Sequence, residues 1–400
     1  MNLVNKNIFK IIVHIIYNEY MSDNLKFHLH NDLPKFTSSR LEYLREKVKE
    51  LMAIPQPAQK SEEWYAFRDT MITASDWGTI LGENHFGNKD QVLLKKCGEN
   101  NYITNSAIKW GNKYEQVATM VYEFRNNVVV HEFGCIKHPT IGFLGASPDG
   151  ITSDGVMLEI KCPSSREITG TPPSYYWCQV QGQLEVCELD RCDFLECKFI
   201  EYSGGEEEYL ADNFEGNVMY NKFGNEKGVI AEIFDKSKGD FIYVYGKVGL
   251  LGEELEEWKT KIIREYSTET QTYTQFIFAS FSYWYLERVS CVPIYRNQEW
   301  FHKARVELEV FWNEILYYRE RGLDKLKEDI NEKKKTKIQK DIDNGKRPRR
   351  SSGPKSKNDT IYIDLNITDF KDDQVKLDIV GYNNAQLKMQ ECNFSLFSDS

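Results

Sequence analysis

Residues 147–163 constrain this chain more than any other stretch, because they place two acidic side chains close together on a predicted β-hairpin. Residues 156–162 are rich in apolar and β-branched types and follow an Asp-Gly pair, a pattern typical of the second strand of a hairpin. Side chains alternate along a strand, so Glu159 and Lys161 lie on one face and Leu158 and Ile160 on the other. The sequence thus predicts a charged face on one hairpin strand.

Asp149 and Glu159 stand at equal distances in sequence from Asp154. A turn centred on Asp154 makes the two carboxylates cross-strand neighbours, with Cβ atoms about 4.5–5.5 Å apart. Like charges at that separation are destabilising unless a cation lies between them, and Mg²⁺ binds one or two carboxylates while keeping waters for a substrate phosphate. Lys161, one same-face step further, could orient the attacking water and neutralise developing charge. The pattern predicts metal-dependent phosphoryl chemistry.

The alternative interpretation of this Glu-x-Lys triplet is a solvated strand face. That is the commoner meaning of so short a pattern, and chance matches to it are frequent. The triplet alone therefore favours the solvated face. The flanking residues must decide between that interpretation and a metal-dependent site.

The composition limits the class of protein. A length of 400 residues fits two or three domains, or one elaborated domain with tails, and 41% hydrophobic residues suffice for a large core. The net charge of −10 excludes a wholesale basic coat for nucleic acid, so DNA contacts must come from local patches or through metal ions. The nine cysteines form no CxxC pair, which predicts reduced thiols in an intracellular protein.

The N-terminal residues 1–36 are expected to form a weakly ordered leader, with Met21 as a candidate start and a buried amphipathic helix as the alternative. The apolar run at 8–17 is shorter than the ~20 residues that a membrane span needs. It also lacks a small-residue cleavage site. We predict no transmembrane segment.

Two helices precede the hairpin region. Residues 39–42 look like a capping box, helical spacing continues to Met52, and prolines at 55 and 57 end the helix. A short helix at 61–68 leads to Ser75, which is placed to cap a further helix and create an anion site. Arg68 and Ser75 could grip a phosphate together; the alternative is an ordinary surface arginine and an ordinary cap.

Residues 105–124 are predicted to form a long helix, and a strand follows at 128–133. Trp110, Tyr114, Val117 and Val121 give the helix an apolar stripe. Glu115 lies beside that stripe. It is either a solvated glutamate or a third carboxylate leaning over the hairpin.

A polar, basic loop at 164–166 and a helix at 175–189 follow the hairpin. Gln179 and Gln183 lie within the apolar stripe of this helix, so they either bond to nearby backbone or face the active site. Strands are expected at 191–200, 229–235 and 241–245. The order helix, strand, strand, helix, strand predicts an α/β (α+β) fold with a central mixed sheet flanked by helices.

The second half of the chain is less informative. Residues 274–292 alternate aromatic and small residues, which favours a core strand over a base-stacking platform. Asn297 should cap a helix that runs to Arg321 and stops at Gly322. Residues 326–358 have the composition of a basic flexible linker with a candidate nuclear import signal at 346–350, and 359–400 form a tail whose tip is either a docking peptide or a frayed terminus.

Taken together, the motifs resemble the lambda exonuclease family, that is, the YqaJ-like viral recombinase or alkaline exonuclease domain of the PD-(D/E)XK nucleases. They cover roughly residues 60–200, inside a domain expected at 37–325 whose elaboration occupies 201–325. In chain order the motifs are Trp64-x-x-x-Arg68, Ile72-Thr73-Ala74-Ser75, Trp110-Gly111-x-x-x-Glu115, Ser147-Pro148-Asp149-Gly150, Leu158-Glu159-Ile160-Lys161-Cys162-Pro163 and Gln179-Val180-Gln181.

The resemblance implies a restriction-endonuclease-like core and an exonuclease from a large DNA virus. Such an enzyme uses Mg²⁺, as two ions that Mn²⁺ can replace, and resects the 5′-phosphorylated strand of duplex DNA to leave a 3′ overhang. By matching position, Asp149 and Glu159 would bind metal with the Ile160 carbonyl, and Glu115 would complete that site or bind the second ion. Lys161 would act on the water. Residues expected to receive the 5′ phosphate or to lie beside the metals are Arg68, Ser75, Ser147, Arg166 and Gln179.

One departure concerns the strand expected before the hairpin. Residues 134–141 offer Lys137 and His138 but no acidic residue where the family has a further aspartate, so a subsidiary contact differs. The ring-shaped trimer known in the family is implied by resemblance alone, and the long extra segments could block it. The expected partners are duplex DNA ends and a single-strand annealing protein, in the host cytoplasm, the virion or the nucleus.

Two other functions remain open. The first is a catalytically inactive DNA-end binding or virion structural protein; the presence of Asp149, Glu159 and Lys161 together argues against it. The second is a PD-(D/E)XK endonuclease. Cleavage of linear but not circular DNA would separate the exonuclease from the endonuclease, and binding without cleavage would indicate the inactive protein.

Overall fold

The fold is seen in a computed structural model that describes residues 36–99, 105–266 and 275–343. The chain divides into two compact units: the described residues up to Asn331 belong to the first, and the described part of the second is 332–343. The predicted leader up to residue 35, the candidate import signal and the tail lie outside the described residues. Within the described ranges, no helix is both long and apolar enough to cross a membrane.

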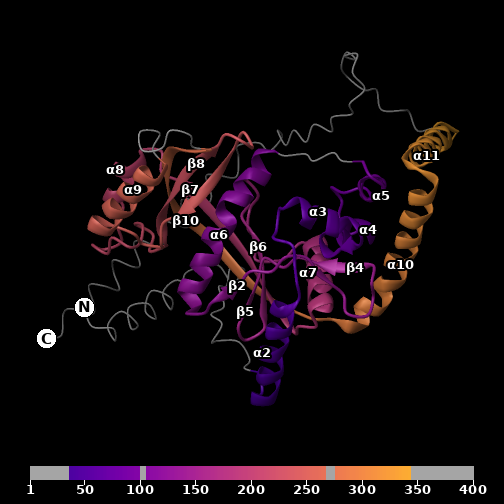
Figure 1. Ribbon diagram of the computed structural model, residues 1–400, viewed down its shortest axis with the longest axis horizontal. Helices are drawn as coiled ribbons and strands as arrows, with labels where there is room; N and C mark the ends of the chain where they lie inside the picture. Colours follow the sequence, from indigo (N-terminus) through magenta and orange to yellow (C-terminus); the bar gives the residue numbers. More distant parts are fainter. Residues whose placement is uncertain (1–35, 100–104, 267–274, 344–400) are drawn as a thin grey trace, which may run out of the picture. The chain divides into compact units, whose positions relative to one another are not determined.

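A seven-stranded mixed sheet forms the centre of the first unit (Figure 1). The pair β6–β7 is parallel and the other neighbours are antiparallel. The predicted α/β fold with a central mixed sheet is therefore confirmed. The strands, in order across the sheet, are β2 (Val130–His131), β5 (Gly150–Thr152), β6 (Val156–Lys161), β7 (Arg191–Glu201), β10 (Phe276–Tyr295), β8 (Lys227–Asp235) and β9 (Asp240–Tyr245).

A smaller sheet of three strands carries the chain into the hairpin. Its order is β1 (Ile72–Thr73), β4 (Leu144–Ala146) and β3 (Ile136–Lys137), with β1 parallel to β4. Strand β4 ends at Ala146 and β5 begins at Gly150, so Ser147 and Asp149 lie in the short connection between these two strands. The strand expected at 134–141 is present only as the short β3.

Helices α6 (Ser106–Asn126) and α7 (Ser174–Cys187) cover opposite faces of the large sheet. Tyr114 of α6 stacks on Phe199 of β7 at a centroid distance of 4.9 Å, and Tyr176 of α7 contacts Phe194 of β7 at 5.7 Å. Phe194 and Phe199 are an odd number of residues apart on one strand, so they point to opposite faces. The predicted order of helix, two strands, helix and strand is thus confirmed as α6, β5, β6, α7 and β7.

The first two described helices differ in how well their caps match expectation. Helix α2 (Ser38–Ala53) starts after Thr37, whose hydroxyl accepts the Arg40 N–H, so the capping box expected at 39–42 is wrong. Helix α2 buries Leu44 and two further apolar residues, but Met52, in its last turn, is 51% exposed. Helix α3 (Glu62–Asp69) is capped by Ser61, in agreement with the short helix expected at 61–68.

Four further helices of the first unit lie around the two sheets. Helix α4 (Ala74–Ile80) lies against α7 and beside α5 (Lys89–Lys96), while α8 (Gly205–Ala211) and α9 (Gly252–Tyr266) lie against β10 (Figure 1). Strand β10 is continuous and packs its aromatic residues against β8 and α9, so the core-strand interpretation is the better one.

Helix α10 (Gln298–Arg321) matches the prediction, because Asn297 caps it and Gly322 ends it. The flexible linker expected from 326 is wrong for 326–343, since α11 (Leu323–Asp343) continues through this range. Leu326 and Ile330 are buried, and Lys325 pairs with Glu328 and Asp329 at helical spacing. The basic composition of this range favours a flexible linker. The good helix propensity of its charged residues and its buried apolar stripe favour a helix more strongly.

Candidate active site

The predicted pairing of the two carboxylates is present at the start of the β5–β6 hairpin. Strand register pairs Gly150 with Leu158, and one further step in the same register places Asp149 opposite Glu159. The Oδ2 atom of Asp149 accepts the N–H of Ile160 at 2.6 Å. The expected loop centred on Asp154 therefore sets the geometry as predicted.

The turn of this hairpin is held by helix α2. Gly155 has a φ of +77°, and a Cβ at that position would lie 2.8 Å from Cβ of Leu44. Arg45 of α2 pairs with Asp154 at 2.8 Å. Close packing and a left-handed glycine together fix the register that brings Asp149 to Glu159.

Glu159 is fully buried, so the solvated-face alternative does not apply. Nε2 of Gln179 donates to its Oε1 at 2.6 Å, and Nε2 of Gln183 donates to its Oε2 at 2.6 Å. Lys161 also donates to Oε1. A buried carboxylate needs such donors, and α7 supplies two of them from positions four residues apart. The glutamines thus face the site instead of bonding to nearby backbone alone.

The half-buried ammonium group of Lys161 lies between the Glu159 carboxylate and the ring of Tyr176. Its Nζ lies 4.7 Å from the ring centroid of Tyr176. Burial lowers the pKa of Lys161, but Glu159 and Asp149 together outweigh burial and raise the pKa above its ordinary value. Lys161 is therefore positively charged at neutral pH. An ammonium can donate hydrogen bonds and stabilise negative charge.

Asp149 experiences repulsion from like charges in a largely enclosed place. Burial, Glu159 and Glu115 all raise the pKa of Asp149 well above its ordinary value, in that order. Glu115 therefore lies close enough to act on Asp149, and its side chain is 33% exposed with Lys60 at 3.5 Å. The arrangement supports the interpretation of Glu115 as a third carboxylate leaning over the hairpin.

The donor chemistry of this cluster suits a hard divalent cation. Asp149, Glu159 and Glu115 offer carboxylate oxygens, the ligands that Mg²⁺ and Mn²⁺ prefer, and a cation would relieve the repulsion that raises the pKa of Asp149. In the described ranges, no group of three or more His, Cys, Asp or Glu residues is arranged to hold a metal ion. Metal binding at this cluster therefore stays a prediction.

Arg68 forms hydrogen bonds with three hydroxyl groups beside the hairpin. Its guanidinium donates to Ser147 Oγ at 3.0 Å, Ser75 Oγ at 2.9 Å and Thr73 Oγ1 at 3.2 Å. The guanidinium carbon also lies 4.2 Å from the ring centroid of Trp64. A planar cation surrounded by hydroxyls is a suitable receptor for a phosphate group. The structure thus brings Arg68, Ser75 and Ser147 together, as predicted.

The cap assigned to Ser75 is wrong. Thr73 is the N-cap residue of α4, and no side chain caps this helix, so Ser75 lies in its first turn. Thr73 instead donates to Asp76 at 3.1 Å. Lys96, which is buried, donates to the carbonyl oxygen of Arg68 at 2.8 Å and lies 3.7 Å from Asp76. The buried Lys96 thus holds the backbone of Arg68 in place beside helix α4.

Arg166 occupies a different position from the other predicted phosphate residues. It pairs with Glu196 of β7, which is buried and lies beside Lys161 in the strand register. Arg166 also donates to the carbonyl oxygen of Glu167 at 3.1 Å. The guanidinium is therefore at the Lys161 end of the site but is held by a carboxylate that sequence reasoning did not single out.

Three contributors to the site were missed from the sequence: Thr73, Tyr176 and Glu196. Thr73 lies two residues before Ser75 in the motif at 72–75, and this spacing is the signal that points to it. Tyr176 precedes Gln179 by three residues on the same helix, and this spacing is the signal that points to it. Glu196 had no signal, because its partners come from another strand and a loop.

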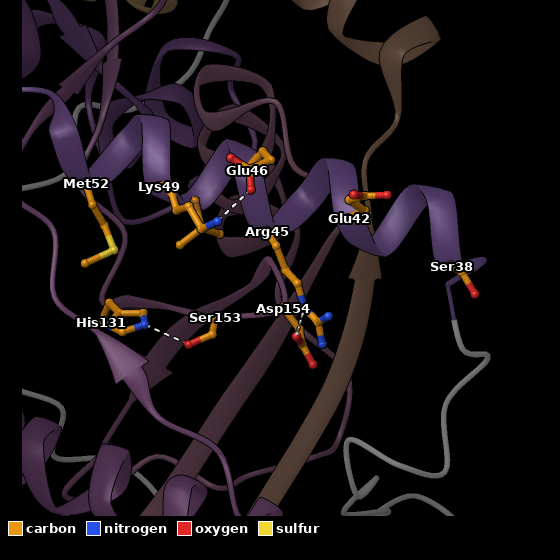
Figure 2. A pocket seen from close by; sticks show the side chains of 10 residues that line it. Ser38, Glu42, Arg45, Glu46, Lys49, Met52, His131, Ser153 and Asp154 are labelled. Atoms are coloured by element: carbon orange, nitrogen blue, oxygen red, sulfur yellow. Dashed lines mark hydrogen bonds and ion pairs between the residues drawn. The ribbon is translucent and has the colours of Figure 1, made fainter.

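A pocket of about 630 Å³ lies away from this cluster, between α2 and the hairpin turn (Figure 2). Arg45 and Asp154 line it together with His131, whose Nε2 lies 2.8 Å from Ser153 Oγ. None of the predicted site residues lines this pocket. Its side chains secure the hairpin instead of adding to the carboxylate cluster.

Comparison with known proteins agrees with the sequence motifs. Residues 63–190 match the family model of the YqaJ-like viral recombinase domain. Uncharacterized protein R354 of Acanthamoeba polyphaga mimivirus is 35% identical over 340 residues, which cover 76% of this chain and 61% of that protein. A curated protein of African swine fever virus (strain Badajoz 1971 Vero-adapted) is 28% identical over 160 residues, covering 32% of this chain and 46% of that protein.

Two solved structures are also similar. The alkaline exonuclease LHK-Exo from Laribacter hongkongensis is 19% identical with a TM-score of 0.39, and the match covers 68% of this chain and 99% of that chain. A phage related exonuclease from Haemophilus somnus 129PT is 11% identical with a TM-score of 0.34, covering 61% and 93% of the two chains.

The family-model match over residues 63–190 agrees with the resemblance to the YqaJ-like viral recombinase domain that the motifs indicate. The viral relatives support an origin in a large DNA virus. The chain spans 61% and 46% of the length of the two curated relatives described above.

Proposed function

We propose that this chain is a divalent-metal-dependent DNA exonuclease that degrades the 5′-phosphorylated strand of a duplex end. The observation that carries the proposal is the pair Asp149 and Glu159, with Lys161 on the same strand as Glu159 and two glutamines fixing the buried Glu159 carboxylate. Such a pair of carboxylates is costly to enclose without a cation. The family match over residues 63–190 supports the same class of reaction.

The residues that would hold the cation are Asp149 and Glu159, with the Ile160 carbonyl beside them and Glu115 completing the site or holding a second ion. When bound, Mg²⁺ or Mn²⁺ supplies charge neutralisation and a more acidic water. Lys161 is an ammonium, so its part is to orient water and stabilise the negative charge that develops on the phosphoryl oxygens. Gln179 and Gln183 keep the Glu159 carboxylate from rotating, and Gln179 is the less buried of the two.

The direction of degradation rests on Arg68. A terminal phosphate bound by Arg68, Ser75 and Ser147 would place the 5′ end of one strand beside the carboxylates, and Arg166 would contact the backbone near Lys161. The terminal phosphate then acts as a stop that sets the register of cleavage. A receptor for a strand end explains why the enzyme would be an exonuclease and not an endonuclease.

The proposal extends to the biological setting. The product is a 3′ overhang, which suits viral recombination, repair or replication with a single-strand annealing protein as partner. A ring-shaped trimer and a place in the host cytoplasm, nucleus or virion are parts of the proposal that rest on the family resemblance.

The experiment compares linear and covalently closed circular duplex DNA in Mg²⁺, in Mn²⁺ and in EDTA. The proposal predicts metal-dependent loss of linear DNA alone, abolished by Lys161→Ala. Lys303→Ala is the matched control, because Lys303 is an exposed lysine paired with Glu299 on α10. Cleavage of closed circles would indicate an endonuclease. Binding of ends without cleavage in any divalent metal would indicate an inactive end-binding protein.

A further inference from the structure

A series of aromatic rings leads from the protein surface to Lys161. The Phe86 ring contacts Tyr175 edge-to-face at a centroid distance of 6.4 Å, and Tyr175 contacts Tyr176 at 4.3 Å. The Nζ atom of Lys161 lies 4.7 Å from the Tyr176 ring. The outermost ring, Phe86, is 77% exposed, while Tyr175 and Tyr176 are half-buried.

The exposure of Phe86 is built into the loop that carries it. The side chain of Asn84 accepts the Phe86 N–H at 3.0 Å and donates to Thr79 Oγ1 at 3.0 Å. The backbone N–H groups of Glu83 and Asn84 both bond to the carbonyl oxygen of Gly78. This short loop between α4 and α5 is therefore well defined, and it presents the ring outward.

The same loop is locked to the helix that carries Tyr175. A Cβ at Gly78 would lie 2.7 Å from Cβ and 2.8 Å from Cα of Tyr175, so α4 and the start of α7 are in backbone contact. Ser174 also bonds to the carbonyl oxygen of Glu83 at 3.4 Å. Phe86 and Tyr175 therefore lie on two segments that pack directly against each other.

Cations flank the rings on the inner side. Lys161 lies at the inner end of the series, with its Nζ atom 4.7 Å from the Tyr176 ring. Arg166 pairs with Glu196, the residue opposite Lys161 in the β6–β7 register. Exposed aromatic surface bordered by cations is the combination that binds single-stranded nucleic acid, because the bases stack on rings while cations meet phosphates.

We propose that Phe86 and Tyr175 form a stacking platform for a nucleobase at the end of the DNA strand that enters the site. The inference rests on the proposed function and deepens it, because it assigns the terminal base of that strand a binding place next to the scissile phosphate. The platform accepts any base, since every base has a π-face. It acts in binding and positioning and takes no part in bond cleavage.

The test uses a duplex with a 5′ phosphate and a fluorescent 2-aminopurine as the 5′-terminal base, bound in Ca²⁺ without Mg²⁺. Stacking on a ring quenches the probe. We expect quenching by the wild type, loss of quenching and about 5- to 100-fold weaker binding in Phe86→Ala, and recovery in Phe86→Tyr. A probe at an interior position of the duplex should give no difference between these proteins.

Phe241→Ala is the matched control. Phe241 is also an exposed ring, 41%, in edge-to-face contact with another ring, Phe234 at 5.4 Å, but it lies on β9 at the far edge of the sheet. It should leave quenching and affinity unchanged. Melting temperatures of all variants show whether each is folded.

The outcomes separate the platform from the proposed function. Equal quenching and affinity in Phe86→Ala and wild type, with DNA still degraded, overturns the platform and leaves the exonuclease intact. A change in oligomeric state in Phe86→Ala without any change in quenching assigns Phe86 to a protein interface and overturns the platform as well. If the folded wild type neither binds nor cuts DNA, both proposals are overturned.

Discussion

Gln183 donates a 2.6 Å hydrogen bond from its Nε2 atom to Oε2 of Glu159, across the interface between helix α7 and strand β6. Its neighbour one turn earlier, Gln179, donates to the other carboxylate oxygen. The orientation of a fully buried carboxylate is thus fixed by the docking of a helix. The angle of that carboxylate toward Asp149 depends on α7 packing as much as on the hairpin.

Replacing Gln183 with methionine should weaken this arrangement. Gln183→Met keeps the volume but leaves a buried charged acceptor without one donor, which costs about 1–3 kcal/mol of unfolding free energy. We also expect a higher Mg²⁺ requirement for DNA cleavage. Urea unfolding and metal titration of the cleavage rate measure the two effects.

Gln181→Met is the control for that substitution. Gln181 is also buried on α7 and makes two hydrogen bonds, but to Tyr295 O and from Asn297 N, away from Glu159. It should lose similar stability with an unchanged metal requirement. An equal change of metal requirement in both variants would contradict the role given to Gln183.

Arg68→Lys should reduce the preference for phosphorylated ends. Lysine keeps the charge but cannot donate to Ser147, Thr73 and Ser75 in one plane, as the guanidinium does. We expect the ratio of cleavage rates on 5′-phosphate and 5′-hydroxyl ends to fall about tenfold or more, because hydrogen bonds to charged groups contribute about 1.5–3 kcal/mol. Arg305→Lys on the exposed side of α10 is the control and should leave the ratio unchanged.

The sequence predicted the hairpin well because its geometry is local. Asp149 and Glu159 lie at equal distances from Asp154, and a tight turn there admits one register, which the structure has. The helix caps were harder to predict. Helix α2 is capped by the Thr37 hydroxyl and not by Ser39, because one hydroxyl is about as good a cap as another. Helix α4 begins after Thr73 with no side-chain cap, so local sequence could not place its first residue.

Long-range partners could not be predicted from the sequence. The bond of Glu196 to Arg166 depends on the parallel pairing of β6 and β7, which no local pattern reveals. Helix α11 was not predicted, and a flexible linker was expected from residue 326 instead. Its charges resemble a linker, and only the burial of Leu326 and Ile330 shows why the helix persists.

Acid should remove the contribution of one buried ion pair to stability. Arg296 bonds to Glu185 at 2.7 Å. Burial raises the pKa of Glu185, but His138 and Arg296 outweigh burial and lower the pKa to about 2 from an ordinary value of 4.5. A folded-state pKa below the unfolded one contributes stability that is present above about pH 4.5 and lost as the pH falls toward 2.

Glu185→Gln tests this pH dependence. At neutral pH the variant should lose about 1–3 kcal/mol of unfolding free energy, and the difference from wild type should shrink as the pH falls below about 4.5. Urea unfolding at a series of pH values measures it. Glu299→Gln, in an exposed pair with Lys303, should show no such trend. A difference that grows in acid would contradict the assignment.

Removal of divalent metal should destabilise the wild type. Mg²⁺ that binds only the folded chain raises the melting temperature relative to EDTA. Because burial and like charges raise the pKa of Asp149, stability without metal falls as the pH rises above the ordinary value of 3.8, and Asp149→Asn should be more stable than wild type in EDTA. The same variant should lose most of the Mg²⁺-induced shift.

Asp240→Asn is the control for the metal experiment, since Asp240 belongs to an exposed pair with Lys109. It should keep the full Mg²⁺-induced shift in melting temperature. The assignment of Asp149 as a metal ligand would fail if Asp149→Asn kept that shift as well.

The most direct test of the proposed exonuclease follows the fate of each strand of a duplex that carries a 5′ phosphate on one strand only. In Mg²⁺, the phosphorylated strand should shorten from its 5′ end while the complementary strand stays intact. Lys161→Ala should leave both strands whole. Equal loss of both strands, loss from the 3′ end, or an intact duplex bound to folded wild-type protein would contradict the proposed activity.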